Sequence, residues 1–110
     1  TGNGNADGTF VYTGFKPAFV MIKVTSRSDQ YWQIKDVKRD TYNQMSKNLY
    51  PNVSDAEGST NPQDFLSNGF KTRTSLNGTN GSGETYIYMA FAEEPLVANS
   101  GTDGVPATAR

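Results

Sequence analysis

The sequence contains no cysteine and no histidine, and these two absences exclude a large part of enzyme and metal chemistry. Without cysteine there is no disulfide, no thiolate nucleophile and no cysteine-ligated zinc. Without histidine the commonest general base and the commonest metal ligand are missing as well. Any catalysis would depend on carboxylates, lysine or tyrosine. We therefore expect a protein that is not an enzyme and that binds no cofactor.

Clustered positive charge and long apolar runs are also missing. The net charge is -1 and the isoelectric point is about 5.2, whereas nucleic-acid binding requires a basic surface. No apolar run approaches the roughly 20 residues that a membrane-spanning helix requires. We therefore expect neither a nucleic acid nor a membrane as a partner.

Turn-forming residues between short apolar runs are what the sequence has in quantity. The chain has 110 residues, 11 of them glycine, a length that suits one domain with one core. Apolar and polar residues alternate with period two, which predicts strands over residues 9–15, 18–26, 31–39 and 69–76. The second and third of these flank the turn "RSDQ" and form an expected hairpin. Segment 40–68 is less periodic, and there we expect one short strand at 47–50 and a crossing loop.

Two of the expected strands have apolar faces that bear on the core. In the strand over 18–26 a small, β-branched face suits burial, and it consists of Ala18, Val20, Ile22 and Val24. The stretch "TYIYMAFAEE" is apolar on both faces and rich in aromatic residues, which favours a strand over a helix. Its two apolar faces predict either a central strand that the domain covers on both sides or a strand that a neighbouring subunit covers.

These elements predict an all-β fold. We expect a single-domain antiparallel β-sandwich, jelly-roll-like, with about six to eight short strands and little helix. The sandwich is expected over residues 1–93, and residues 94–110 are expected to form an extended C-terminal tail. The chain begins inside a glycine- and asparagine-rich phrase without a methionine, so we expect it to be part of a longer chain.

Five segments in order carry a family resemblance: "GNGNADGTFVYTGFKPAFVMIK", "WQIKDVKRDTYN", "KNLYPNVSDAE", "DFLSNGFKTRT" and "GETYIYMAFAEEP". They resemble a domain family found in virion proteins of tailed bacteriophages, especially phages of marine and cyanobacterial hosts. The resemblance covers nearly the whole chain. Such domains often lie at the C-terminal end of tail-fibre-like or appendage proteins, sometimes after a concanavalin-like lectin domain.

The resemblance implies a place in the virion and a class of function, but no catalytic or ligand-binding residue. We expect a receptor-binding module of a phage appendage that contacts a host cell-surface glycan or receptor. The same resemblance implies a homo-oligomer, with a trimer expected, and contacts with other virion proteins. Two alternatives stay open: a structural capsid-decoration or fibre-capping oligomerisation module, and a small glycan hydrolase. No pair of carboxylates stands out for glycoside hydrolysis.

The candidate ligand-binding residues are polar groups beside aromatic ones. Sugars stack their C–H faces on aromatic rings and give their hydroxyl groups to planar polar partners. The segment that begins at Trp32 and continues through "DVKRDTYN" has this composition, with Asp36, Arg39, Asp40, Tyr42 and Asn43. The alternatives are that Asp36 and Arg39 form an ion pair at a strand end, that Tyr42 packs inward and that Trp32 belongs to the core.

Two loops are expected to carry the contact with the host, residues 40–48 and residues 77–83. The second contributes Asn77 and Asn80 as candidate ligand-binding residues, because loops cluster at the ends of a sandwich. The phrase "NGNADG" spaces Asn3, Asn5 and Asp7 like the start of a calcium loop, but the bidentate glutamate that such a loop needs is missing. We therefore expect no metal site.

Overall fold

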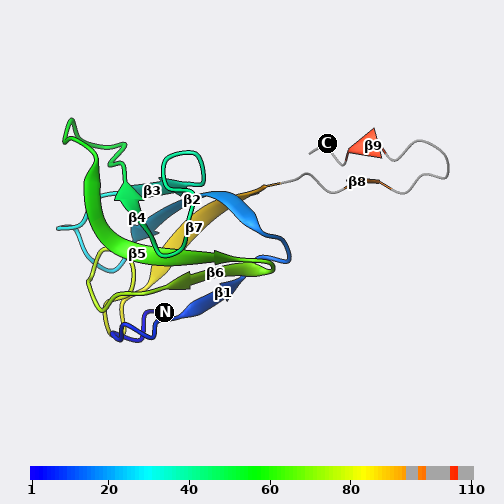
Figure 1. The fold of residues 1–110 in the computed structure, drawn as a ribbon. Coiled ribbons are helices and arrows are strands. Elements are labelled where there is room, and N and C mark those ends of the chain that lie inside the picture. Colours follow the sequence, from blue (N-terminus) through cyan, green and yellow to red (C-terminus); the bar gives the residue numbers. More distant parts are fainter. Residues whose placement is uncertain (94–96, 99–104, 107–110) are drawn as a thin grey trace.

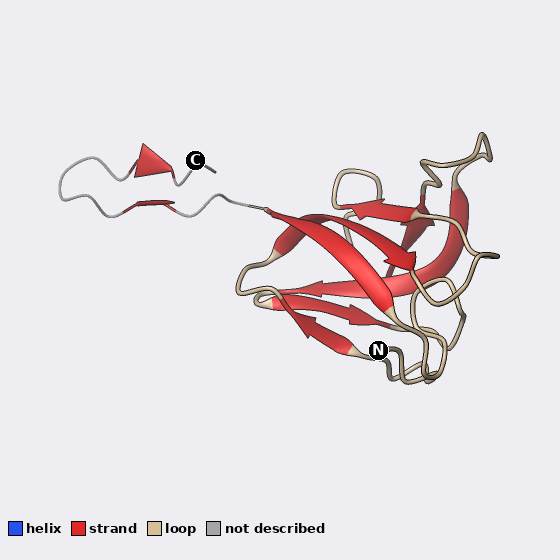
Figure 2. Cartoon of the chain, turned by 180° about the vertical axis from the view of Figure 1, so that it is seen from behind, coloured by secondary structure: helices blue, strands red, loops and turns tan. Residues whose placement is uncertain are grey.

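Two antiparallel β-sheets pack against each other to form the body of the protein (Figure 1). The computed structural model describes residues 1–93, 97–98 and 105–106, and within these ranges it contains strands and loops but no helix (Figure 2). The predicted single-domain β-sandwich is therefore confirmed. None of the described residues forms a helix long and apolar enough to cross a membrane.

The larger sheet has four strands and the smaller sheet has three. The larger sheet runs in the order β1 (Phe10–Tyr12), β6 (Gly69–Thr72), β5 (Gly58–Leu66) and β4 (Met45–Asn48). The smaller sheet runs in the order β3 (Gln33–Asp36), β2 (Pro17–Val24) and β7 (Tyr86–Ala92). The expected hairpin is present, because β2 and β3 pair antiparallel across the predicted turn.

A separate pair of short strands follows the sandwich in sequence. Strand β8 (Val97–Ala98) pairs antiparallel with β9 (Val105–Pro106). The expected extended tail over residues 94–110 otherwise lies outside the described residues.

The apolar core lies at one end of the space between the sheets. Val20, Met45, Phe65 and Phe70 form a buried cluster, and Val11, Val37 and Ala90 pack against it. The predicted inner face of β2 is confirmed, because Val20, Ile22 and Val24 are all buried. Burial of such side chains is the main favourable contribution to folding.

Toward the other end of the sandwich the interior becomes polar. The inner face of β5 changes from Phe65 through Gln63 to Asn61, and all three side chains are buried. Strand β3 places Gln33 and Lys35 in the same region. The Lys35 ammonium donates hydrogen bonds to the carbonyl oxygens of Ser46 and Thr60, at 2.8 and 3.1 Å.

Strand β5 is the longest strand of the sandwich, and the sequence did not predict it. Its inward residues beyond Phe65 are amides, so the apolar period that marks a half-buried strand is absent. Pro62 lies within it, and Asn61 has a positive φ of 51°, a value that residues other than glycine seldom adopt. Both features are typical of loops, which explains why the sequence indicated a crossing loop here. The structure has strand β5 instead, so that expectation is wrong.

The two sides of the sandwich differ. On one side the backbones of Ile34 and Leu49 exchange two hydrogen bonds, at 2.9 and 3.1 Å, and join β3 to β4. On the other side β1 and β7 are the edge strands of their sheets. A hollow of about 340 Å³ lies there, lined by aromatic residues that include Tyr12, Tyr86 and Tyr88.

Strand β7 is an edge strand, so the expectation of a central strand covered on both sides by the domain is wrong. The predicted alternation is correct: Tyr88 faces inward and packs edge-to-face on Phe70, with ring centroids 5.3 Å apart. Ile87, Met89 and Phe91 point outward and are about half exposed. Cover by a neighbouring subunit stays a prediction.

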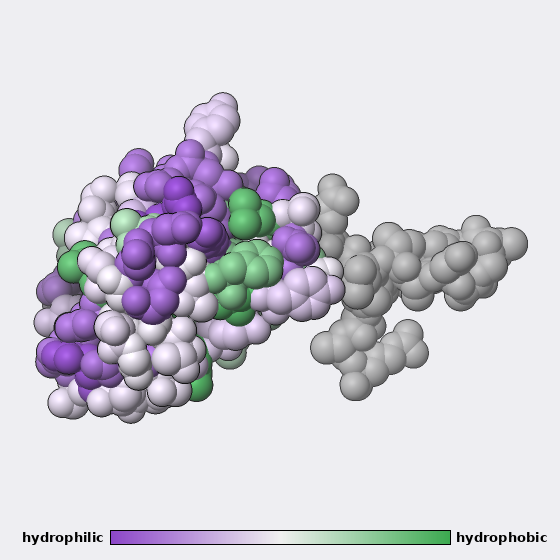
Figure 3. Space-filling model, turned by 90° about the horizontal axis from the view of Figure 1, so that it is seen from below, coloured by the Kyte–Doolittle hydropathy of each residue, from purple (hydrophilic) through white to green (hydrophobic). Residues whose placement is uncertain are grey.

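The outer faces of the two sheets carry different chemistry. On the four-stranded sheet Lys71 pairs with Asp7 at 2.6 Å, and Arg73 pairs with Asp64 at 3.3 Å. Seen from the side where β1 lies in Figure 1, the surface is mostly hydrophilic or of intermediate hydropathy, with a hydrophobic group near its middle and smaller ones at its margins (Figure 3). On the three-stranded sheet, by contrast, the register places Phe19 beside Phe91 and Met21 beside Met89.

Candidate functional site

A cleft of about 450 Å³ opens at the polar end of the sandwich. Five segments line it: the β2–β3 loop, the start of β3, the β4–β5 loop, the first half of β5 and the loop that follows β6. The lining residues are Asp29, Gln30, Tyr31, Gln33, Tyr50, Asp55, Thr60, Asn61, Leu76, Asn77 and Gly78. A concave site with a few convergent polar groups is the usual form of a small-ligand site.

Two tyrosines form an aromatic wall of this cleft. The rings of Tyr31 and Tyr50 meet edge-to-face, with centroids 5.7 Å apart and an interplanar angle of 75°. Tyr31 is 44% exposed, so part of its ring is open to solvent or to a ligand. The Tyr50 hydroxyl lies 3.3 Å from the Thr60 hydroxyl, which fixes the second ring against the start of β5.

Two buried amides form the floor of the cleft. Gln33 is 3% exposed and Asn61 is 6% exposed. The side-chain oxygen of each has no hydrogen-bond partner among the described residues, although both residues line the cleft. Buried polar atoms without partners are rare, because each costs the free energy of its lost hydration. Both oxygens lie below the surface of the cleft, so they are a cost to stability and not open acceptors for a ligand.

Position 78 requires glycine, because the neighbouring amide side chains leave no space for a Cβ atom. A Cβ atom at position 78 would overlap the Gln33 side-chain nitrogen and would lie 3.2 Å from the Asn61 side-chain oxygen. Any larger residue at position 78 would push on both amides.

The charged groups that line the cleft are both acidic. Arg27 donates two hydrogen bonds of 2.8 Å to the Asp29 carboxylate, and this pairing lowers the Asp29 pKa to about 2. Asp55 is exposed and forms no ion pair with any described residue. Because no lysine or arginine lines the cleft, its mouth carries an uncompensated negative charge.

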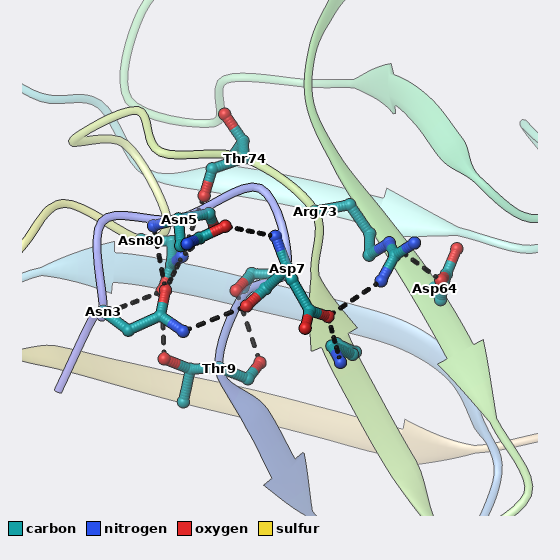
Figure 4. A network of polar contacts seen from close by, with 10 residues as sticks. Asn3, Asn5, Asp7, Thr9, Asp64, Arg73, Thr74 and Asn80 are labelled. Carbon is teal, nitrogen blue, oxygen red and sulfur yellow. Dashed lines mark hydrogen bonds and ion pairs between the residues drawn. The ribbon is translucent and has the colours of Figure 1, made fainter.

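Asn80 holds the loop that forms one side of the site. Its amide nitrogen donates to the Asn3 side chain and to the carbonyl oxygens of Asn5 and Thr74, at 2.7, 2.9 and 2.8 Å. Its amide oxygen accepts from the Asn3 backbone and from the Thr9 hydroxyl, at 3.1 and 3.0 Å. Figure 4 shows this residue beneath the N-terminal loop, surrounded by these partners.

This network determines what the two asparagine candidates of the 77–83 loop can do. Asn80 is fully buried and its side-chain atoms are all engaged, so it has a structural role and offers no free atom to a ligand. Asn77 lines the cleft, and its carbonyl oxygen accepts a 2.7 Å hydrogen bond from Tyr86. Burial raises the pKa of Tyr86, which therefore stays protonated and keeps this bond.

The calcium-like spacing in the N-terminal loop is used for turns and ion pairs. The Asn3 side chain accepts from the Asn5 backbone, and the Asn5 side chain accepts from the Asp7 backbone, at 3.0 and 2.9 Å. A hydrogen bond from Lys71 lowers the Asp7 pKa. Among the described residues no three histidine, cysteine, aspartate or glutamate side chains gather closely enough to hold a metal ion.

The candidates around the β3–β4 loop do not line the cleft. Asp36 and Arg39 form the ion pair that was the alternative interpretation, at 3.3 Å, and Arg39 also contacts Glu57 at 2.7 Å. The Asp40 carboxylate accepts from the backbone N–H groups of Ser46 and Lys47, at 2.7 and 3.1 Å. Burial opposes its ionisation, but these bonds outweigh burial and keep its pKa low.

The other three candidates have separate surroundings. Asn43 bonds to the Phe65 backbone through both its amide nitrogen and its amide oxygen, each at 2.9 Å, and so joins its loop to β5. Tyr42 is 82% exposed and does not pack inward. Trp32 is half-buried on the outer side of the three-stranded sheet, where it lines a shallow hollow with Met21 and Pro51. The predicted residues thus do not converge on one site.

A family of proteins described as a domain of unknown function (DUF7483) matches residues 1–95. The chain belongs to this family. The match spans the whole sandwich, including the three loops that line the cleft and the edge strand β7. The DUF7483 chain has no significant match among curated proteins or among solved structures.

The sequence missed most of the cleft residues for a physical reason. Gln33 and Asn61 are buried amides, and no periodic pattern distinguishes a buried amide from an exposed one. Tyr31 and Tyr50 are far apart in the chain, and only the β3–β4 contact brings them together. A weak signal was present in the density of asparagine, glutamine and tyrosine in the loops.

Proposed function

We propose that this protein is a non-catalytic binding module whose cleft takes a carbohydrate of a cell surface. The observation that carries the proposal is an aromatic wall, Tyr31 with Tyr50, in a cleft whose other lining residues are mostly polar. Sugar rings present C–H faces that pack on aromatic rings. Their hydroxyl groups both donate and accept hydrogen bonds, and polar lining residues such as Gln30, Thr60 and Asn77 can do the same.

The family resemblance supplies the biological setting of the proposal. The segments that resemble phage virion domains support a receptor-binding module at the tip of a virion appendage, with a host glycan as its partner. A single cleft of this size supports modest affinity, and several copies in one appendage would raise the overall affinity through avidity. Both the virion setting and the host are parts of the proposal.

A glycan array with the isolated domain, followed by calorimetric titration of the best ligand, tests the proposal. Tyr31→Ala should weaken binding about tenfold, because one aromatic packing contact contributes on the order of 1 kcal/mol. Gly78→Ala should weaken binding while the fold is retained, because the added methyl group displaces the ends of the Gln33 and Asn61 side chains that line the cleft.

The matched control is Tyr42→Ala, which removes an exposed tyrosine that does not line the cleft. It should leave binding unchanged. Loss of binding in this control, with normal binding in Tyr31→Ala, would move the site to the 40–48 loop. A parent domain that binds no glycan on the array would reject the proposed function.

A structural oligomerisation module is the second candidate function, and the exposed apolar face of the three-stranded sheet favours it. Phe19, Met21, Met89 and Phe91 lie together on that face, and β7 presents a free backbone edge beside them. Exposed edge strands usually carry charge, proline or a bulge that prevents pairing, and the sequence of β7 contains neither charge nor proline. We propose that a second copy of the chain covers this face in a homo-oligomer.

Sedimentation analysis over a range of concentrations tests this second candidate. The parent should be oligomeric, with a trimer expected from the resemblance, and Met89→Lys should be monomeric with an unchanged fold. Lys47→Met, which removes rather than adds a charge on the other sheet, should keep the oligomer. A monomeric parent at high concentration would reject this candidate.

A further inference from the structure

Along the free edge of β7 a row of backbone groups has no partner in the sheet. At the start of the strand the Thr25 N–H donates to the Thr85 carbonyl oxygen at 2.8 Å, so the backbone of Thr85 faces β2. The register with β2 is regular over residues 86–91, and successive residues of an antiparallel strand point their N–H and C=O groups to opposite sides. The backbone groups that point away from β2 are therefore those of Tyr86, Tyr88, Ala90 and Ala92.

The N-terminal loop limits how far another strand can extend along this edge. The Gly2 N–H donates to the Glu84 carbonyl oxygen at 2.9 Å, on the side of the chain that faces away from β2. An added strand therefore has room beside Tyr86–Ala92 but not beside Glu84. This free stretch of seven residues has a length that is usual for a strand.

The sequence of β7, YIYMAFA, is complementary to an antiparallel copy of itself. When two copies are centred on Met89, every pair on the inner face places a large ring opposite a small side chain. These pairs are Tyr86 with Ala92 and Tyr88 with Ala90. They are also the residues with free backbone groups, so each pair exchanges two hydrogen bonds.

The outer face of β7 is complementary in the same register. Ile87 lies opposite Phe91 of the second copy, and pairs of β-branched and aromatic residues stabilise antiparallel sheets. A register centred one residue earlier than Met89 would bring the second strand to Glu84, where the N-terminal loop already lies. A register centred one residue later would place Ile87 opposite the charged Glu93. The pairing about Met89 avoids both conflicts.

From these observations we propose that two copies of the chain pair through antiparallel β7 strands, related by a twofold axis at Met89. This inference rests on the second candidate function, an oligomerisation module, and specifies how the copies meet. The two three-stranded sheets join into one continuous sheet, and their apolar outer faces become one face. A twofold axis closes the assembly at two copies, so a dimer takes the place of the trimer that the resemblance implies.

The available surface suits a weak but specific dimer. Ile87, Met89 and Phe91 are 50%, 50% and 55% exposed. Two such strands with their free backbone groups bury on the order of 1,000 Å², about the minimum for a specific interface, so we expect a dissociation constant in the micromolar range. The charges agree with the pairing. Lys23 lies in register with Ile87 near the start of β7, and Glu93 follows its end, so the axis brings opposite charges toward each other.

Single cysteine substitutions test the register, because the chain has no cysteine of its own. At the axis the two copies of position 89 form a non-hydrogen-bonded pair, with Cα atoms about 4.5 Å apart, which a disulfide can span. Met89→Cys in the full 110-residue chain should therefore form a covalent dimer rapidly in mild oxidant. Mass spectrometry identifies the linked peptides, and circular dichroism checks that the fold is unchanged.

Ile87→Cys and Phe91→Cys are the matched controls, because both positions lie on the same face as Met89 and are similarly exposed. In either variant alone the two cysteines would lie roughly 14 Å apart across the axis. Each should therefore cross-link at least about tenfold more slowly than Met89→Cys, which gains from a high effective concentration. An equal mixture of the two controls should cross-link rapidly, because the register places position 87 opposite position 91.

Sedimentation of the parent separates this inference from the candidate function on which it rests. A dimer with the expected cross-linking pattern supports both. A trimer, or equal cross-linking rates in all three single variants, would overturn the twofold pairing of β7 and leave the oligomerisation module standing. A parent that stays monomeric far above micromolar concentration would overturn both.

Discussion

The two halves of the interior of this sandwich are built from different residues. One half contains Val20, Met45, Phe65 and Phe70, packed as an apolar cluster. The other half contains buried amides, threonines and Lys35 beside Ile22 and Val24, and several of the polar residues have atoms that lack partners. Apolar burial stabilises a fold, whereas buried polar groups cost free energy unless they are hydrogen-bonded. The comparison indicates that most of the stability comes from one half, and the proposed binding cleft lies at the other.

The apolar half should give the largest effect on stability. Phe70 is fully buried and contacts both sheets, through Val20 and Phe65 in the cluster and through Tyr88 on β7. Phe70→Ala should lower the free energy of unfolding by about 3–5 kcal/mol, a large part of the 5–15 kcal/mol that is typical of a small domain. Chemical denaturation measures this change, and a loss below about 1 kcal/mol would contradict the assignment of the core.

The polar half should show itself in the pH dependence of stability. Burial lowers the Lys35 pKa from 10.5 to about 8, with Asp40 opposing the shift. Between these two values the unfolded chain binds more protons than the folded chain, so stability should rise with pH. The full rise would be about 3 kcal/mol, at 1.36 kcal/mol per pKa unit.

Denaturation midpoints measured between about pH 7.5 and pH 10 check this rise. Lys35→Met should abolish it, because the titrating group is gone. Lys38→Met, at an exposed position three residues after Lys35, should keep it. A flat profile in the parent would show that Lys35 is solvated and that the polar half is wetter than the structure indicates.

A smaller loss of stability should follow when the hydrogen bonds between Asn80 and the N-terminal loop are removed. Asn80→Ala removes a buried amide that bonds to Asn3, Asn5, Thr9 and Thr74 (Figure 4). The expected cost is about 2 kcal/mol, because partners such as the Thr74 carbonyl would stay buried without a donor. Asn68→Ala, at an exposed hairpin turn, should change stability by less than about 0.5 kcal/mol.

Hydrogen exchange separates this interpretation from a direct role of Asn80 in ligand binding. Asn80→Ala should lose protection at the amides of residues 2–9 in the absence of any ligand. If protection is kept and only glycan binding falls, Asn80 contacts the ligand after all.

The same contrast explains what could be predicted from the sequence. Strands β2 and β7 have apolar residues at every second position. These strands and the inner face of Val20, Ile22 and Val24 were therefore predicted correctly. The inward residues of β5 are mostly amides and give no apolar period, so β5 and the amides at the cleft floor were not predicted. Predicted ligand groups such as Asp40 and Asn43 bond to backbone instead, because local sequence does not show which polar atoms the fold consumes.

Strand β7 also shows the limit of pattern reasoning. Its composition indicated burial on both faces, but composition does not distinguish a strand within a sheet from a strand at its edge. Register and sheet order decide that, and they place Phe91 beside Phe19 at the outer surface, with ring centroids 5.6 Å apart. The apolar residues that indicated a core therefore mark a face that is open in the single chain.

The smallest effect on the stability of the single chain is expected at this open face. Phe91 is 55% exposed where Phe70 is fully buried, so Phe91→Ala loses only part of a surface contact with Phe19. In dilute solution the free energy of unfolding should fall by less than about 1 kcal/mol, against about 3–5 kcal/mol for Phe70→Ala.

If copies of the chain pair through β7, the two variants should respond differently to protein concentration. The melting temperature of the parent and of Phe70→Ala should rise with protein concentration, because association stabilises the folded state. That of Phe91→Ala should rise less, because the variant removes contact area from the interface. Concentration-independent melting of all three proteins would show that the outer face of β7 is not a subunit interface, and a loss near 4 kcal/mol for Phe91→Ala in dilute solution would restore β7 to the core.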